Sequence, residues 1–86
     1  MDNKIGVTII MPIYNAESFL NDSIGSLLAQ TCDRWNLICI DDGSSDASGH
    51  IVDQFAISDS RFVVKHQVNG GESKARNEGL KIASGD

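Results

Sequence analysis

The sequence predicts an α/β fold with a parallel sheet. Three short runs of aliphatic and β-branched residues are each followed by a segment whose apolar residues recur at helical spacing. Turn-forming residues separate each run from the helical segment behind it. Strands that alternate with helices pair in parallel through right-handed crossovers. We therefore expect three βα units that form a parallel, Rossmann-like half sheet.

The first unit begins with the nearly continuous apolar run 7–13, which is typical of a strand covered on both faces. Pro12 lacks an N–H for the strand ladder, so the strand should end close to it. An amphipathic helix is expected from about 16 to 30, with Asn15 as its N-cap. The apolar residues expected on its buried face are Phe19, Leu20, Ile24, Leu27 and Leu28.

The second unit repeats this plan. A buried strand is expected at 35–40 and a helix at about 47–57, which Asp46 or Ser45 would cap. The aliphatic character of the strand predicts that Cys39, which lies inside it, is a small core residue.

The third unit has an expected strand from 62 to 65 or 66, a glycine loop at 69–71 and a helix at about 73–83. The final residues, 83–86, resemble a helix end that leads towards a further strand. We therefore expect residues 1–86 to be the N-terminal part of a longer, truncated domain.

Composition restricts the class of protein. With 86 residues, 41% hydrophobic and 22% charged, the chain suits one small globular core. A net charge of −5 argues against nucleic acid as a partner. The chain has no membrane segment, because no apolar run approaches the ~20 residues that cross a bilayer, and its start does not resemble a secretory signal. We expect a cytoplasmic protein, with any attachment to the inner face of the membrane made by segments outside these residues.

Cysteine and histidine give no sign of a metal site. Cys32 and Cys39 are too few and wrongly spaced for a four-ligand zinc site. His50 and His66 belong to no metal-binding motif, so we expect structural roles for both. No metal ligand is predicted among these residues.

Two carboxylates, Asp41 and Asp42, directly follow the second strand, at the end of the sheet where open α/β folds bind ligands. Paired carboxylates in a crevice cost free energy unless each holds a cation, accepts an N–H or caps a helix. Gly43 would let the chain turn where a side chain would collide, and Ser44 can bond local N–H groups. Both would also suit a turn without a ligand.

Other candidate residues surround this turn. Tyr14 follows the first strand and could stack on a base, at about 1–3 kcal/mol, or simply pack as a half-buried side chain. Lys74 and Arg76 lie near the start of the third helix, where free N–H groups favour anions. Since they diverge by about 200° on a helix, they cannot both face one phosphate. The glycine loop matches no phosphate-binding motif.

Three motifs follow the three strands in order: Pro-Ile-Tyr-Asn at 12–15, Asp-Asp-Gly-Ser-Ser-Asp at 41–46, and Asn-Gly-Gly-Glu-Ser-Lys-Ala-Arg-Asn-Glu-Gly at 69–79. Together they resemble family 2 glycosyltransferases of the GT-A fold, and the resemblance covers nearly the whole chain. It implies a nucleotide-sugar-binding half, with the nucleoside held across the carboxyl ends of the strands.

The resemblance also implies individual roles. Asp42 would read the base, since a carboxylate can accept the N3–H of uracil and reject cytosine, whose N3 is an acceptor. Asp41 would orient the turn or a basic partner, and Arg76 rather than Lys74 would contact the nucleotide. The predicted nucleotide-binding residues are Pro12, Tyr14, Asn15, Asp41, Asp42, Gly43, Ser44 and Arg76.

The implied activity is sugar transfer from a nucleotide-sugar donor, a UDP-sugar, to a hydroxyl of a saccharide or lipid-linked acceptor with inversion, as in polysaccharide biosynthesis. A divalent metal, Mg²⁺ or Mn²⁺, would neutralise the departing diphosphate, and a general base would deprotonate the acceptor. The family places both beyond these motifs, in segments outside this chain. We therefore expect no catalytic residue within 1–86. This segment would bind the donor without turnover.

Two other classes are alternatives. A receiver-like signalling domain would carry its acidic pair after the first strand and a phosphoryl-accepting Asp after the third. A dinucleotide-binding module would carry glycines in its first turn, where this chain has Pro-Ile-Tyr-Asn at 12–15. Both alternatives disagree with the first strand and its turn.

Overall fold

The computed structural model describes residues 6–29 and 34–85 and contains all three predicted βα units. In chain order they are β1 (Val7–Ile13), α1 (Glu17–Leu28), β2 (Trp35–Asp42), α2 (Ser48–Ser58), β3 (Phe62–Gln67) and α3 (Glu72–Ser84). The expected helix end at Gln30, as well as Cys32 and Asp86, lies outside the described residues. Within the described part of the chain, no helix has the length and apolar character needed to cross a membrane.

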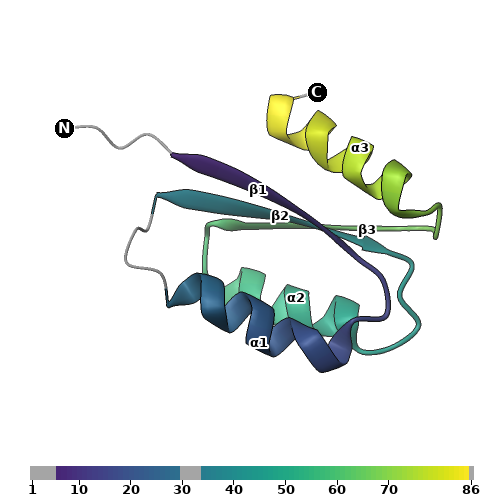
Figure 1. Cartoon of the computed structure of the whole chain (residues 1–86), viewed down its shortest axis with the longest axis horizontal. Coiled ribbons are helices and arrows are strands. Elements are labelled where there is room, and N and C mark those ends of the chain that lie inside the picture. The colour runs from purple at the N-terminus through teal and green to yellow at the C-terminus, as the bar shows by residue number, and fades with distance from the viewer. Residues whose placement is uncertain (1–5, 30–33, 86) are drawn as a thin grey trace.

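The three strands form one parallel sheet in the order β1-β2-β3. Ile13 pairs with Asp41 at the end of β1, and Asp42 pairs with Gln67 at the end of β3. Helices α1 and α2 lie on one face of the sheet and α3 on the other (Figure 1). The predicted α/β half sheet is confirmed, and its central strand carries the acidic pair at its carboxyl end.

The central strand β2 supplies much of the core because its successive side chains point to opposite faces. Leu37 and Cys39 pack in the cluster that includes α1 and α2, and Ile38 and Ile40 pack against Ala75 of α3. The prediction that Cys39 is a core residue is confirmed, since its side chain is fully buried, and this burial raises the pKa of its thiol to about 12. Both faces of β2 are therefore covered by hydrophobic side chains.

Helix α1 buries a narrower stripe than the sequence predicts. Leu20 and Ile24 are buried, whereas Phe19 is 68% exposed and Leu28 is 39% exposed. The expectation that Phe19 and Leu28 face the core is therefore wrong. Leu20 and Ile24 lie one turn apart on one line of the helix, whereas Phe19 is rotated by about 100° from Leu20.

Helix α3 approaches β1 closely at Gly79. A Cβ atom there would overlap Cγ2 of Ile10, which is attached directly to a branched Cβ and moves only if χ1 changes. We expect Gly79→Ala to lower the free energy of unfolding by about 1 kcal/mol, because overpacking outweighs the gain in helix propensity. The matched control is Gly25→Ala in α1, where a Cβ meets nothing within 4 Å. Denaturant unfolding should show the control slightly stabilised, and equal stabilisation of both variants would contradict this packing.

Candidate functional site

A pocket of about 260 Å³ lies at the carboxyl ends of β1 and β2, beside the start of α3. Three predicted site residues, Pro12, Tyr14 and Asp42, line it. The remaining lining residues are Ile13, Asn69, Gly71, Glu72 and Ala75. The predicted residues outside this lining are Asn15, Asp41, Gly43, Ser44 and Arg76.

Tyr14 is the first residue after β1 and is 55% exposed. The preceding residue, Ile13, is 2% exposed and belongs to the core. The chain therefore passes from the core to the surface within one residue. An aromatic ring in this position can present a face to a planar ligand in the pocket.

Asp42 is 3% exposed, and both of its carboxylate oxygens accept hydrogen bonds. Oδ1 accepts from Gln67 Nε2 at 2.9 Å and from the Gly70 N–H at 2.9 Å. Oδ2 accepts from Asn69 Nδ2 at 3.1 Å and from the Gly71 N–H at 2.9 Å. The Gln67 bond, followed by those of Gly70 and Gly71, lowers the pKa of Asp42, so this carboxyl group is charged at neutral pH.

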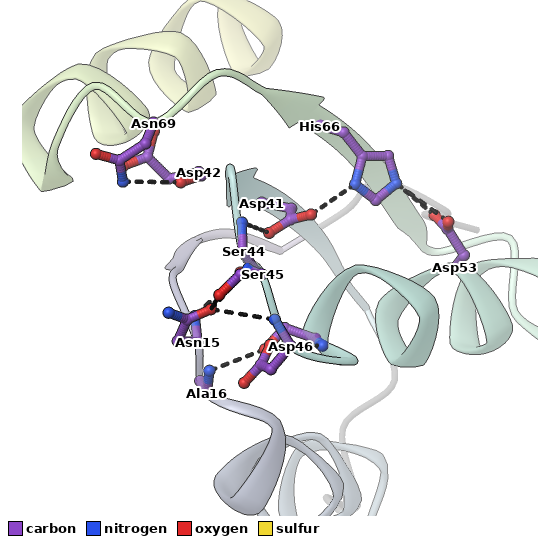
Figure 2. A network of polar contacts seen from close by, with 11 residues as sticks. Asn15, Ala16, Asp41, Asp42, Ser44, Ser45, Asp46, Asp53, His66 and Asn69 are labelled. Carbon is purple, nitrogen blue, oxygen red and sulfur yellow. Dashed lines mark hydrogen bonds and ion pairs between the residues drawn. The ribbon is translucent and has the colours of Figure 1, made fainter.

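These bonds also fix the glycine loop at 69–71, which connects β3 to α3. The N–H groups of Gly70 and Gly71 are directed at Asp42, and Asn69 Nδ2 donates to both the Asp42 carboxylate and the Asp42 carbonyl oxygen, the latter at 2.9 Å. Asp42 therefore holds the β3–α3 loop against the end of β2. Figure 2 shows the Asn69 contact, with Asp42 pointing away from Asp41.

Asp41 points to the opposite face of the sheet from Asp42 (Figure 2). Its Oδ1 accepts from the Ser44 N–H at 3.1 Å, and its Oδ2 lies 2.8 Å from His66 Nδ1. The prediction that Asp41 orients the turn or a basic partner is confirmed, because it does both. The side chain is 8% exposed and does not line the pocket.

His66 joins three elements in a way that its lack of a motif concealed. Its Nε2 lies 2.9 Å from Asp53 of α2, while its Nδ1 contacts Asp41 of β2. The hydrogen bond to Asp41 has the largest effect on His66 and raises its pKa, and the hydrogen bond to Asp53 raises this pKa further. No local sequence signal marks this pair, because it depends on the strand register that places His66 directly opposite Asp41 in the sheet.

This contact predicts a pH-dependent stability. Because the folded-state pKa of His66 lies above its usual 6.5, the stabilisation is complete below pH 6.5 and is lost as pH rises through the folded-state pKa. The imidazole is 46% exposed, so solvent screening limits the effect to about 1 kcal/mol or less. Unfolding of His66→Gln should therefore differ from wild type more at pH 5.5 than at pH 8.5. The control is His50→Gln, which changes an exposed α2 residue, and a pH-independent difference for His66→Gln would refute the prediction.

The prediction that Asn15 is an N-cap is wrong, because the N-cap of α1 is Ala16. Asn15 instead has φ +49°, and its side chain turns towards the β2–α2 turn. Its Oδ1 accepts from the N–H of Ser45 at 2.8 Å and from the N–H of Asp46 at 3.3 Å (Figure 2). Sequence reasoning missed this bridge since a cap and a bridge use the same side-chain acceptor.

The N-cap of α2 is Ala47, so the prediction of Asp46 or Ser45 at that position is wrong, but Asp46 still bonds the first turn of the helix. Asp46 Oδ1 accepts from the Ser48 N–H at 2.9 Å. Its other oxygen, Oδ2, accepts from the Glu17 N–H of α1 at 3.2 Å. One carboxylate thus satisfies N–H groups at the starts of two helices.

The turn after β2 depends on a glycine, as predicted. Gly43 has φ +73°, and a Cβ there would lie 2.6 Å from the backbone N of Asn69. The next residue, Ser44, accepts the Asn15 N–H with its Oγ at 3.0 Å. Gly43 and Ser44 therefore shape the turn and connect it to the loops on either side.

Arg76 lies one helical turn after Glu72 in α3. Its Nη2 pairs with Glu72 Oε2 at 3.2 Å, and its side chain is 52% exposed. Glu72 lines the pocket, so the Arg76 guanidinium reaches the pocket's edge through this pair. Lys74, the other basic residue near the start of α3, is exposed.

Metal-binding groups do not gather in this part of the molecule. Across residues 6–29 and 34–85, no three His, Cys, Asp or Glu side chains are arranged to hold a metal ion. The carboxylates of Asp41 and Asp42 are engaged by protein donors.

Solved structures define the class of protein to which this geometry belongs. The structure of S. aureus TarS (residues 1–349) superposes with a TM-score of 0.79 at 29% identity, over 87% of this chain and 23% of TarS. The mannosyltransferase PcManGT of Pyrobaculum calidifontis, in complex with GDP-Man and Mn²⁺, superposes with a TM-score of 0.74 at 19% identity, over 92% of this chain and 24% of PcManGT. The chain has the fold of the GT-A glycosyltransferases.

The family follows from the sequence comparison. The model of glycosyl transferase family 2 matches residues 8–86, so the chain belongs to this family. It is 48% identical to the uncharacterized glycosyltransferase EpsJ of Bacillus subtilis (strain 168) over 79 residues, which are 92% of this chain and 23% of EpsJ. It is 46% identical over 86 residues to WfgD of Escherichia coli, named as a UDP-Glc:α-D-GlcNAc-diphosphoundecaprenol β-1,3-glucosyltransferase, covering 99% of this chain and 33% of WfgD. The chain thus spans a minor part of these relatives.

Proposed function

We propose that residues 1–86 form the N-terminal, donor-binding part of a glycosyltransferase domain and bind the nucleotide of a UDP-sugar in the strand-end pocket. The observation that carries this proposal is the placement of an aromatic ring, Tyr14, and a charged carboxylate, Asp42, in one pocket. Membership of family 2 supports a sugar-nucleotide as the ligand. The name of WfgD, which uses UDP-Glc, supports uridine as the base.

Recognition of uracil would use both residues. The base would stack on Tyr14, and its N3–H would donate to Oδ2 of Asp42, which faces the pocket residues Asn69 and Gly71. The incoming N3–H would replace the longer Asn69 bond, because the Asn69 amide keeps its bond to the Asp42 carbonyl oxygen. Cytosine carries an acceptor at N3 and would face the carboxylate unfavourably.

The other predicted residues would act around this contact. Pro12 would form part of the pocket wall, and Arg76 would reach the diphosphate after it leaves Glu72. Asn15, Asp41 and Ser44 would shape the turns that border the pocket through their hydrogen bonds, and Gly43 would do so through its positive φ. The N-terminus of α3 would add a favourable field for the phosphates.

The whole protein would transfer the sugar to a hydroxyl of a saccharide or lipid-linked acceptor, with inversion. A divalent cation, Mg²⁺ or Mn²⁺, would neutralise the diphosphate, and a general base would deprotonate the acceptor, both held by segments outside this chain. The lipid-linked acceptor in the name of WfgD supports a cytoplasmic site at the inner face of the membrane. Residues 1–86 would bind the donor without turnover.

Calorimetric titration of the full-length protein with UDP, CDP and NAD⁺, each with and without Mn²⁺, tests this proposal. We expect UDP to bind at least tenfold more tightly than CDP, because only uracil offers a donor at N3. We also expect Mn²⁺ to strengthen UDP binding. Preferential binding of NAD⁺, or equal binding of UDP and CDP, would contradict the proposal.

A further inference from the structure

We infer that Asn15 is a positioning residue for Tyr14: it fixes the backbone behind the aromatic ring and does not itself contact the nucleotide. This inference rests on the proposed function of the pocket. Asn15 does not line the pocket, whereas Tyr14 does. The question is therefore what the Asn15 side chain and its unusual backbone conformation accomplish.

The backbone of Asn15 is left-handed, with φ +49°, and no other non-glycine residue in 6–29 and 34–85 has a positive φ. Asparagine accepts this region more readily than most residues. Such a conformation persists only where surrounding contacts hold it. Here the chain reverses direction directly after Tyr14, so the conformation of Asn15 sets the path on which Tyr14 lies.

The contacts that hold Asn15 run in both directions between two turns. The Asn15 N–H donates to Ser44 Oγ at 3.0 Å, while Asn15 Oδ1 accepts from the backbone N–H of Ser45 at 2.8 Å and of Asp46 at 3.3 Å (Figure 2). The turn after β1 is thereby bonded to the turn after β2. Neither turn can move away without breaking its hydrogen bonds to the other.

The next residues continue this connection. The Ala16 N–H donates to Ser48 Oγ at 2.8 Å, and Glu17 Oε1 accepts the Ala47 N–H at 3.0 Å. The Glu17 N–H in turn donates to Asp46. The starts of α1 and α2 thus cap each other, and Asn15 lies where this reciprocal set of bonds meets the pocket.

Tyr14 is therefore an exposed residue with both chain neighbours fixed. On one side Ile13 is buried in the sheet and pairs with Asp41, and on the other side Asn15 is bonded to the β2–α2 turn. A ring carried by such a short, fixed segment is preorganised for stacking, which lowers the entropic cost of binding. Without the Asn15 bonds, the chain on that side of the ring would be held only from Ala16 onward.

Calorimetric titration of the full-length protein with UDP tests this role in a double-mutant cycle of Asn15→Gly and Tyr14→Ala. Glycine retains access to the left-handed conformation and removes only the side-chain acceptor. We expect Asn15→Gly to weaken UDP binding about tenfold. In the Tyr14→Ala background the same change should have less than about a twofold effect, since no ring is left to position.

Two further variants separate this effect from stability. Asn21→Gly places glycine at an exposed position inside α1, where its low helix propensity destabilises the fold. We therefore expect a lower melting temperature and unchanged UDP affinity for this variant. Ser44→Ala removes only the acceptor of the Asn15 N–H, so we expect UDP affinity about threefold weaker, again only while Tyr14 is present. This variant carries the test if Asn15→Gly does not fold.

The outcomes distinguish the two proposals. If wild type binds no uridine nucleotide, the proposed function fails and this inference fails with it. If wild type binds UDP and Asn15→Gly binds it equally well, this inference alone is overturned. Additive losses in the double variant would also overturn it, because they would show that Asn15 acts independently of Tyr14.

Discussion

Asp42→Asn is expected to weaken UDP binding by the full-length protein roughly 10- to 100-fold. The wild-type carboxylate accepts hydrogen bonds on both oxygens, two of them from the backbone N–H groups of Gly70 and Gly71. An asparagine amide offers one acceptor and places an NH₂ group against the remaining donors. The β3–α3 loop would then shift away from β2, and the acceptor proposed for uracil N3–H would be weakened.

The same variant should lower the melting temperature by roughly 5–10 °C, because buried donors lose their acceptor. Asp22→Asn is the matched control, since Asp22 is exposed on α1. Calorimetry and thermal unfolding should leave this control indistinguishable from wild type. Unchanged UDP affinity in Asp42→Asn would remove Asp42 from the base-reading role, whatever happens to stability.

Gly43→Ala is expected to lower the free energy of unfolding by about 2–4 kcal/mol. Two effects combine, because φ +73° is unfavourable for alanine and the new Cβ would lie 2.6 Å from the Asn69 backbone nitrogen. Backbone atoms cannot move aside as a flexible side chain can. The Asn69 loop should shift instead, so UDP binding should weaken together with stability.

Gly85→Ala separates the two effects. Gly85 also has a positive φ, +85°, but a Cβ there meets nothing within 4 Å. Denaturant unfolding should show a loss of about 1 kcal/mol for this control, which reports backbone strain alone. Equal losses at Gly43 and Gly85 would contradict the collision with Asn69.

The sheet could be predicted from the sequence because its strands are buried on both faces and read as unbroken apolar runs. The run at 35–40 predicted β2, and the structure extends it through Asp41 and Asp42 by pairing with β1 and β3. A strand that continues into charged residues gives no apolar signal for its last positions. The location of the acidic pair at the strand end was nevertheless correct.

The side-chain partners were harder to predict. The two carboxylates differ because successive strand residues point to opposite faces, which directs Asp41 towards His66 and Asp42 towards the glycine loop. That division requires the register of β3 against β2, which the sequence does not state. The role of Asn15 depends in the same way on bringing two turns together, from residues 29 to 31 positions apart.

The site therefore consists of two layers. Of the pocket residues, Tyr14 directly follows β1 and Asp42 ends β2, and the two meet at one edge of the sheet. Behind them, Asn15, Asp41 and His66 bond the turns and strands together, with no part in the pocket lining. This division explains why a set of motif residues shares one region of the fold while only some of them line the pocket.

A crystal structure of the full-length protein with UDP would show whether the base binds between Tyr14 and Asp42. We predict that the uracil ring stacks on Tyr14 and that its N3 lies about 3 Å from a carboxylate oxygen of Asp42. The turn after β1 and the turn after β2 should keep the hydrogen bonds that join them in that complex. Uracil bound away from Tyr14 and Asp42 would contradict the account.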